Sequence, residues 1–251
     1  MESLWPILKT LKKKKWIDLT HPLDNQTPYW DGIPEGSVAL AETAVDYPDI
    51  MDLKIQTFKF PGQFGTHIDY PAHFVNDPKA RLAKDFTLEE TVLPLVVIDV
   101  SEKVKGNVDY ELTVQDILDF ESIYGKIPEN AFVAMRTDWH KRYPDGEALS
   151  NKDADGIEHF PGWTIETLEF LYDQRGVSGT GHETLDTDAA ITSTAVGDLQ
   201  AERYVLERDK FQVEMLANLD QCPAVGAIIV IVAPRIVEAN GLPVRAFAIL
   251  P

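Results

Sequence analysis

The sequence predicts a mixed α/β or barrel-like domain in which strands outnumber helices. Five β-branched or continuously apolar runs are typical of buried strands, and three segments of the chain body have helical features. The two kinds alternate irregularly over 251 residues, of which 44% are hydrophobic. No repeat, low-complexity segment or linker divides the chain, so we expect one domain over residues 1–251.

The chain begins with a peripheral segment, residues 1–16, that is expected to form a short helix. Its apolar residues fall on one helical face, at Leu4, Ile7, Leu8 and Leu11. Residues 12–15 are all lysine and form the only basic cluster of the sequence. A solvated helix end explains this cluster, and a subunit contact is the alternative.

Residues 21–36 are expected to form a loop, because prolines and glycines interrupt them. Trp30 lies within this loop, which could fold over a binding site. Beyond the loop, the expected strands share apolar and β-branched sequences. They are residues 93–100, 131–137, 177–179, 225–232 and 246–250.

Three helices are expected in the chain body. The first covers residues 113–123 and begins with a Thr-x-x-Asp cap. The second runs from Thr164 to about residue 174 and stops at Gly176, because glycine ends helices readily. The third covers residues near 198–208.

The most informative stretch is residues 63–73, Gln-Phe-Gly-Thr-His-Ile-Asp-Tyr-Pro-Ala-His. Pro71 prevents a helix from continuing through it, so an extended or turning backbone is expected. In a strand, side chains two positions apart share a face. Gln63, His67 and Asp69 would then point the same way.

Such a face offers an imidazole nitrogen, a carboxylate and an amide oxygen to one point, which is how proteins hold a divalent metal. Imidazole suits zinc, whereas the carboxylate and the amide favour manganese. His73 lies beyond the turn at Pro71 and is free to act as an acid or base beside the metal. The alternative is a loop with two solvated histidines, but two of the six histidines fall here beside an acid.

This segment resembles the signature of the bacterial kynurenine formamidase and putative cyclase family, His-x-Gly-Thr-His-x-Asp-x-Pro-x-His, with Gln63 in place of the first histidine. Further segments fall in family order, namely residues 18–23, 27–30, 159–162, 181–188, 214–219 and 243–246. The resemblance implies a swivelling β/β/α barrel and a metal-dependent amidohydrolase acting on cyclic or aryl amides. It also implies a homo-oligomer, either a dimer or a tetramer.

The resemblance further implies that Glu214 binds the metal, because a ligand glutamate opens the matching Glu-x-Leu-x-x-Leu run of the family. An ordinary surface glutamate is the alternative. A second family ligand, a histidine, falls at Glu202 in this chain. Because Gln63 and Glu202 both stand at family histidine positions, the number of ions, one or two, is open.

His182 and Glu183 follow the expected strand 177–179 and precede Asp186 and Asp188. The end of a buried strand beside a glycine-rich turn is a common place for binding residues. One of the pair His182 and Glu183 is therefore expected to reach the site as a further metal ligand. In the alternative interpretation, Asp186 and Asp188 simply cap a helix or turn.

Aromatic walls for an aryl substrate are expected from Trp30, Phe64 and Trp139. Closure of an apolar core is the alternative role for such residues. Covalent catalysis by serine or cysteine is not indicated, because there is no Gly-x-Ser-x-Gly motif and Cys222 precedes a proline beside an apolar run.

The composition excludes several partner classes. A formal net charge of −18 speaks against nucleic acid, whose phosphates require basic patches. The longest apolar run, residues 225–233, is too short to cross a bilayer, so no membrane partner is expected. Cys222 is the only cysteine, which excludes an internal disulfide and fits a reducing cytoplasm.

We therefore predict a metal-dependent hydrolase of an aryl formamide, cyclic amide or lactone, similar to kynurenine formamidase or isatin hydrolase. The metal would activate a water, and His73 would transfer its proton. N-formylkynurenine is one candidate substrate. A lyase or cyclase that uses the same groups is the competing enzymatic interpretation, and a non-catalytic, metal-dependent small-molecule binding protein is the non-enzymatic one.

Overall fold

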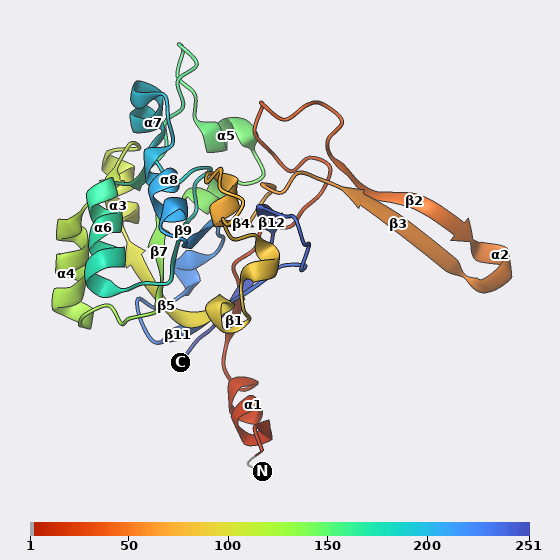
Figure 1. Cartoon of the computed structure of the whole chain (residues 1–251), viewed down its shortest axis with the longest axis horizontal. Coiled ribbons are helices and arrows are strands. Elements are labelled where there is room, and N and C mark those ends of the chain that lie inside the picture. Colours follow the sequence, from red (N-terminus) through yellow and green to blue (C-terminus); the bar gives the residue numbers. More distant parts are fainter. Residues whose placement is uncertain (1–2) are drawn as a thin grey trace.

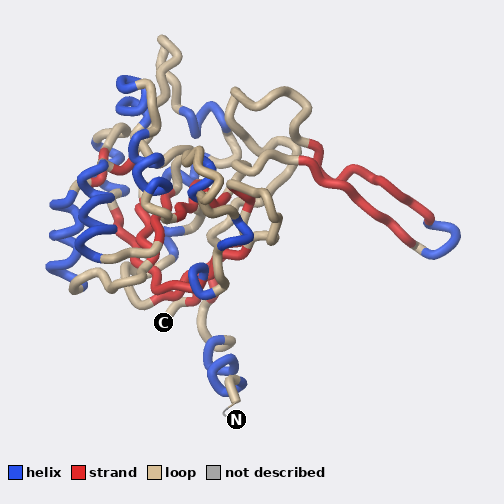
Figure 2. Tube along the Cα trace, viewed as in Figure 1, coloured by secondary structure: helices blue, strands red, loops and turns tan. Residues whose placement is uncertain are grey.

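The computed structural model describes residues 3–251. Its centre is a curled, mixed, nine-stranded sheet in the order β1-β13-β11-β5-β7-β9-β10-β4-β12 (Figures 1 and 2). The parallel strands are β5 (Val92–Asp99), β7 (Phe132–Arg136), β9 (Gly179–His182) and β10 (Phe211–Glu214). The antiparallel strands are β1 (Trp16–Asp18), β4 (His67–Asp69), β11 (Ala227–Val232), β12 (Gly241–Pro243) and β13 (Arg245–Ile249).

Helices cover one face of this sheet (Figure 1). The principal ones are α3 (Ser101–Gly106), α4 (Val114–Tyr124), α6 (Ile165–Glu169) and α8 (Gln200–Glu207). The predicted cap of α4 is present, because Thr113 and Asp116 exchange backbone and side-chain hydrogen bonds as a capping box. A turn of π-helix follows α6 over Phe170–Gln174.

Successive side chains of a strand point to opposite faces of the sheet, so the buried apolar residues form two clusters, one on each face. Val96 and Ile98 of β5 pack under the helices, together with Ile117 of α4. Leu95 and Val97 point to the opposite face and join the cluster enclosed by the curl of the sheet. The sheet is therefore buried on both faces, which explains why its central strands are continuously apolar.

Two elements project from this body, and neither pairs with the main sheet (Figure 1). The first is an arm, formed by β2 (Ala39–Tyr47) and β3 (Leu53–Lys59) with the short helix α2 (Pro48–Met51) at its tip. The second is α1 (Trp5–Leu11). The remaining short elements are α5 (Gly146–Ser150), α7 (Ala190–Val196) and the paired strands β6 (Glu111–Leu112) and β8 (Gly162–Trp163).

The mixed α/β class, the five predicted strands and the helices near 113–123, 164–174 and 198–208 are confirmed, with bounds shifted by a few residues. The N-terminal helix is also present but occupies only Trp5–Leu11. The arm was not predicted. No helix among residues 3–251 combines the length and the apolar character that a bilayer crossing requires.

Candidate metal centre

A buried polar cluster lies where β4, β9 and β10 run side by side. β4 pairs antiparallel with β10, so that His67 lies opposite Glu214. Ile68 and Val213 alternate with these residues and enter the apolar cluster inside the curl. The polar side chains of β4 and β10 therefore share the helix-covered face of the sheet, at the carboxyl end of β10.

Three ligand atoms converge in this cluster. Nε2 of His67 is 3.3 Å from Oδ2 of Asp69 and 3.4 Å from Oε2 of Glu214. All three side chains are buried. Nδ1 of His67 is 2.9 Å from the carbonyl oxygen of Gly65, which only accepts, so Nδ1 carries the proton and donates it. In neutral His67 the lone pair on Nε2 thus faces the two carboxylates, as in a metal ligand.

A second group adjoins the first and shares Asp69 with it. Nε2 of His73 is 4.0 Å from Oδ1 of Asp69 and 3.8 Å from Oε1 of Glu202. Pro71 begins the single 3-10 turn that carries His73 past the end of β4. Glu202 lies in the first turn of α8, whose backbone N–H groups at Ala201 and Glu202 donate to Asp188. Asp188 thus binds the N-terminal turn of α8, although it is not the residue that precedes that helix.

The donor set fits a divalent cation. Nε2 of His67 and Oδ2 of Asp69 are buried and have no hydrogen-bond partner in the described chain. Buried polar atoms are nearly always paired, so unpaired atoms that face one another indicate a missing partner. A cation ligated by His67, Asp69 and Glu214 would satisfy both atoms.

The pKa shifts of the buried groups also indicate that the cluster has an excess of negative charge. Burial raises the pKa of Glu202 well above its usual range, and Glu214 and Asp69 raise it further. Burial likewise raises the pKa of Asp186 well above its usual range, with Glu214 adding to the effect. Burial lowers the pKa of His67, but Asp69 and Glu214 outweigh it and raise that pKa well above 6.5. In the absence of a metal, these carboxyl groups and the imidazole hold protons that a bound cation would displace.

Gln63 lies beside this cluster, but it does so from the turn before β4 and not from the strand face that was predicted for it. Its Nε2 donates a hydrogen bond of 2.9 Å to Oδ1 of Asp69. Gly241 of β12 makes room for this contact, because a Cβ there would lie 2.0 Å from Nε2 of Gln63 and 3.0 Å from Oδ1 of Asp69. The structure thus presents the amide nitrogen of Gln63 to Asp69, and Gln63 positions that carboxylate rather than offering its oxygen to a metal.

Two polar residues that were not predicted orient Glu214. Nε2 of Gln212 donates to Oε1 of Glu214 at 3.0 Å, and Oγ1 of Thr187 donates to Oε1 of Gln212 at 2.6 Å. Both are fully buried. The polar–apolar alternation of Phe-Gln-Val-Glu over residues 211–214 was the available signal, because it places Gln212 on the face of Glu214.

Of the predicted pair, the structure brings His182 to the cluster and not Glu183. Nε2 of His182 is 3.3 Å from Oε1 of Glu214. Glu183 instead accepts hydrogen bonds from the backbone of Thr137 and Trp139 and lies 2.7 Å from Nδ1 of His140. Successive side chains at a strand end point to opposite sides, so only one member of this pair could face Glu214.

The predicted aromatic residues do not enclose a common space. Trp30 is 76% exposed. Trp139 is buried in the cluster under the helices, where its indole nitrogen donates to the carbonyl of Leu149. Phe64 is fully buried and stacks against Phe60 with ring centroids 6.0 Å apart. Only Phe64 thus adjoins a groove, the one formed at the base of the arm.

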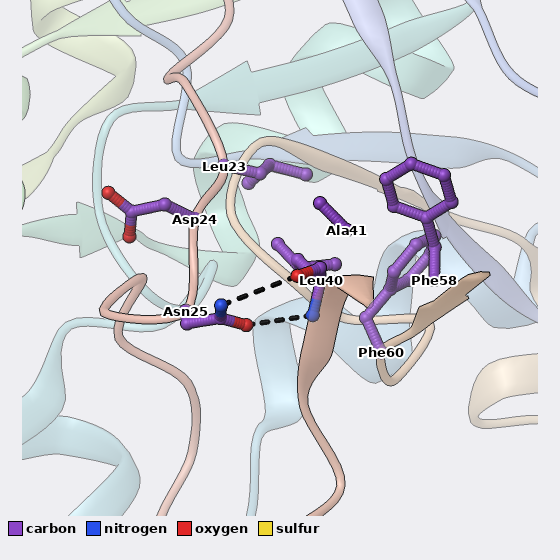
Figure 3. A pocket seen from close by; sticks show the side chains of 7 residues that line it. All are labelled: Leu23, Asp24, Asn25, Leu40, Ala41, Phe58 and Phe60. Carbon is purple, nitrogen blue, oxygen red and sulfur yellow. Dashed lines mark hydrogen bonds between the residues drawn. The ribbon is translucent and has the colours of Figure 1, made fainter. Parts of the chain in front are cut away.

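This groove has a volume of about 360 Å³ and a mainly apolar lining (Figure 3). Its lining residues are Leu23, Asp24, Asn25, Leu40, Ala41, Phe58 and Phe60. Asn25 pairs with the backbone of Leu40 and fixes the loop 21–36 to the arm. Leu23 also packs on Gly65, where a Cβ would lie 2.2 Å from its Cδ2. The groove therefore adjoins the segment that carries His67.

Comparisons with known proteins show which family the chain resembles in sequence. A sequence model of the family described as putative cyclase matches residues 17–189. The isatin hydrolase of Roseibium aggregatum is 33% identical over 189 residues, which are 74% of this chain and 71% of that protein. The kynurenine formamidase of Bacillus anthracis is 34% identical over 95 residues, covering 36% of this chain and 41% of the relative.

Solved structures extend the likeness over the whole chain. Isatin hydrolase A from Labrenzia aggregata, bound to benzyl benzoate, is 35% identical with a TM-score of 0.88, and 99% of each chain is covered. An isatin hydrolase bound to the product analogue thioisatinate is 27% identical with a TM-score of 0.88, and the match covers 100% of both chains. A potential metal-dependent hydrolase with cyclase activity shares the fold, at 19% identity and a TM-score of 0.67 over 93% of this chain and 96% of that one.

Proposed function

The chain belongs to the putative cyclase family, and on that basis we propose that it is a metal-dependent hydrolase that cleaves the carbon–nitrogen bond of an amide. One observation carries the proposal. An imidazole and two carboxylates, from His67, Asp69 and Glu214, bring their ligand atoms within 4.8 Å of one another on the same buried face, and the half-buried imidazole of His73 adjoins them. The relatives named as isatin hydrolase and kynurenine formamidase support the class of reaction.

His67, Asp69 and Glu214 would hold the ion. We propose a single ion, because Gln63 donates to Asp69 and Glu202 faces His73 at the two family histidine positions. Carboxylate oxygens outnumber imidazole nitrogens in this set, which favours manganese over zinc. A divalent ion bound there supplies Lewis acidity, by which a water becomes nucleophilic near neutral pH and a carbonyl oxygen is polarised.

The chain's own residues supply the proton transfers. His73 Nε2 is within reach of Asp69 and is 26% exposed, so it can meet both the cluster and a substrate. We assign His73 as the base that accepts a proton from the attacking water and returns it to the departing amide nitrogen. Asp69, fixed by the amide of Gln63, orients the imidazoles of His67 and His73.

A small cyclic amide such as isatin is the substrate class that we propose first. By sequence, an isatin hydrolase matches 74% of this chain, whereas the kynurenine formamidases match between 36% and 47% of it. The apolar groove at the base of the arm, with Phe58 and Phe60 in its lining, suits an aryl ring. N-formylkynurenine and aryl lactones are further candidates.

We also propose that residues 1–251 act as one catalytic domain with residues 1–16 at its periphery, and that copies of the chain assemble into a dimer or tetramer. The single cysteine, which cannot form an internal disulfide, fits a cytoplasmic enzyme.

Hydrolysis assays test this function. The purified protein, stripped of metal and reloaded with Mn²⁺ or Zn²⁺, is incubated with isatin, formanilide and an aryl lactone, and ring opening or deformylation is followed by absorbance. We expect turnover of at least one amide by the loaded wild type, and loss of turnover in His67→Ala together with its metal. Binding of these compounds without turnover by the loaded wild type would instead identify a binding protein.

A further inference from the structure

We propose that Glu202 recognises the N–H group of the departing amide nitrogen, so that the site selects secondary amides over N-alkylated amides and lactones. A secondary amide is one whose nitrogen carries a single hydrogen atom. This inference rests on the hydrolase function proposed above and narrows its substrate class. It makes Glu202 a contact residue of the substrate, beside the base His73.

Glu202 lies deep in the site and close to the histidine that transfers the proton. It stands in the first turn of α8 and is 2% exposed. Because α8 packs against the turn Pro71–His73, Oε1 of Glu202 lies 3.8 Å from Nε2 of His73. The departing nitrogen must approach Nε2 of His73 to receive its proton. It therefore also comes within reach of the Glu202 carboxylate.

The carboxylate of Glu202 lacks a hydrogen-bond donor of its own. A separation of 3.8 Å is too long for a hydrogen bond with His73, and no other donor contacts this carboxylate in the described part of the chain. The backbone N–H of Glu202 donates to Asp188, and the neighbouring guanidinium of Arg203 pairs with Asp198. A buried carboxylate without a donor is unfavourable, so a donor brought by the substrate is stabilised there.

The titratable groups around Glu202 are mostly acidic. Burial raises its pKa, and the carboxylates of Glu214, Asp69, Asp186 and Asp188 raise it further. Ionised carboxylates only accept hydrogen bonds, so the chain surrounds Glu202 mainly with acceptors. A carboxyl group keeps an acceptor oxygen whether or not it carries a proton. The group that completes this part of the site is therefore a donor.

An amide nitrogen that carries one hydrogen atom suits the space beside His73 and Glu202. When the water oxygen bonds to the carbonyl carbon, the nitrogen loses its conjugation and gains a free lone pair next to its N–H. The lone pair takes the proton that His73 carries, the carbon–nitrogen bond breaks, and a carboxylic acid and an amine result. The N–H meanwhile donates to Glu202, which turns the lone pair toward His73.

Two classes of substrate lack this donor. A lactone places an oxygen that has only lone pairs against the Glu202 carboxylate, and an N-methyl amide places a methyl group there. Both leave a buried acceptor unpaired. Sites built to bond an N–H group discriminate strongly against analogues without it, because the buried polar group then has no partner.

Matched pairs of compounds test the inference. Isatin and N-methylisatin differ only in the group on the nitrogen, and kcat/KM for each is divided by the rate constant of its uncatalysed hydrolysis. If another amide is the one turned over, the pair is that amide and its N-methyl derivative. Calorimetric binding of oxindole and N-methyloxindole, lactams without the activated carbonyl of isatin, gives a readout that needs no turnover.

Three variants separate the acceptor from the charge and the volume. Glu202→Met keeps the approximate volume and removes the acceptor, whereas Glu202→Gln removes the charge and keeps an acceptor oxygen. Glu207→Met, at the exposed end of the same helix, is the matched control. Metal content and circular dichroism are measured for each variant.

We expect the wild type and the Glu207→Met control to prefer isatin over N-methylisatin by a factor of about 100 or more. Glu202→Gln should retain most of this preference. Glu202→Met should lower the preference to less than about tenfold, chiefly by slowing the hydrolysis of isatin. The two oxindoles should bind the wild type with different affinities and Glu202→Met with similar ones.

Several results would overturn the inference. Equal normalised efficiencies for the isatin pair in the wild type would refute N–H recognition and leave the hydrolase function intact. A preference that survives in Glu202→Met would show that the methyl group is rejected by its size. Loss of the bound ion from Glu202→Met would make Glu202 a metal ligand. If no amide is turned over, the hydrolase function fails, and equal or absent binding of the oxindoles then overturns the inference as well.

Discussion

His67 and Glu214 lie directly opposite each other on the antiparallel strands β4 and β10, with Nε2 and Oε2 3.4 Å apart. Asp69, two positions along β4, completes the group from the same face of the sheet. The geometry of the proposed ligands is thus set by strand register, whereas His73 depends on the turn at Pro71. This division permits metal binding and proton transfer to be tested separately.

Removal of the central imidazole should abolish metal binding. We expect the wild type to bind about one ion per chain and His67→Ala to bind metal with an affinity more than about 100-fold lower. Even the loss of a residue that only supports a ligand lowers metal affinity by about 10–100-fold. Metal content after dialysis, measured by mass spectrometry, checks this result. His159→Ala is the control, since His159 pairs with Asp109 and Asp153 and belongs to neither cluster. Full metal retention in His67→Ala would contradict the assigned site.

Replacement of His73 should affect turnover and not metal content. In His73→Asn we expect kcat to fall about 10²–10⁴-fold, which is the usual contribution of general acid–base catalysis. Metal content should match the wild type, because His73 is not among the proposed ligands. Kinetics with the reloaded enzyme test this prediction. A normal kcat would remove His73 from the mechanism, and loss of the metal would make it a ligand.

Metal should stabilise the fold, because a cation relieves the repulsion among the buried carboxylates Asp69, Glu202 and Glu214. At a free metal concentration of 100 times the dissociation constant, mass action adds about 2.7 kcal/mol. For a domain of this size that corresponds to roughly 5–10 °C in Tm. Thermal unfolding with and without a chelator measures the shift. The same shift in His67→Ala would show that the metal binds elsewhere.

Stability should decrease in acid because of a histidine outside the metal cluster. Burial lowers the pKa of His21 from 6.5 to about 4, and His140 adds to the effect. The unfolded chain then binds more protons than the folded one below about pH 6.5, so the free energy of unfolding falls as the pH falls toward 4. Between pH 7.5 and 5 this loss amounts to about 2 kcal/mol.

His21→Gln tests this assignment, because it removes the titrating group. The variant should have a flatter dependence of unfolding free energy on pH between 5 and 7.5, measured by urea denaturation at each pH. An identical slope in variant and wild type would assign the acid sensitivity to other groups.

A methyl group at residue 241 should disturb the cluster locally. The Cβ of Gly241→Ala would lie 2.0 Å from Nε2 of Gln63, which is the free end of a flexible side chain and can move away. Asp69 then loses its hydrogen bond, and we expect metal affinity to fall about 10-fold or more. Gln63→Ala should lose metal affinity to a similar extent, and the double variant should lose no more than either single variant. Calorimetric titration with the metal measures these affinities. Additive losses would mean that Gly241 acts through another contact.

Local signals in the sequence were sufficient for much of the fold. Continuous apolar runs identified β5, β7, β11 and β13, and in β7 the run reflects burial on both faces of the sheet. The cap at Thr113 located α4. The spacing of His67 and Asp69 indicated a shared strand face, which β4 provides. Each of these features depends on residues that are near one another in the chain.

Features that depend on distant pairing were not predictable. Thr187, which follows β9, contacts Gln212 only because β9 and β10 pair side by side in the sheet. Glu183 was grouped with His182, but its partners come from the loop after β7. The arm was missed because its strands, Ala39–Tyr47 and Leu53–Lys59, mix polar and apolar residues without a buried face. A hairpin that packs on nothing in its own chain leaves no periodicity to detect.

The pairing of β4 with neighbours on both sides has a consequence for how this protein could diverge. His67 and Asp69 are held in a three-residue strand between β10 and β12, so a slip of one position would turn both side chains into the apolar interior. Gln63 and Glu202 lie outside that strand, in a preceding turn and on a helix. Substitutions that alter the choice of metal or substrate are therefore tolerated most easily at positions such as Gln63 and Glu202. A change in the placement of His67 and Asp69 would also disrupt the pairing of β4 in the sheet.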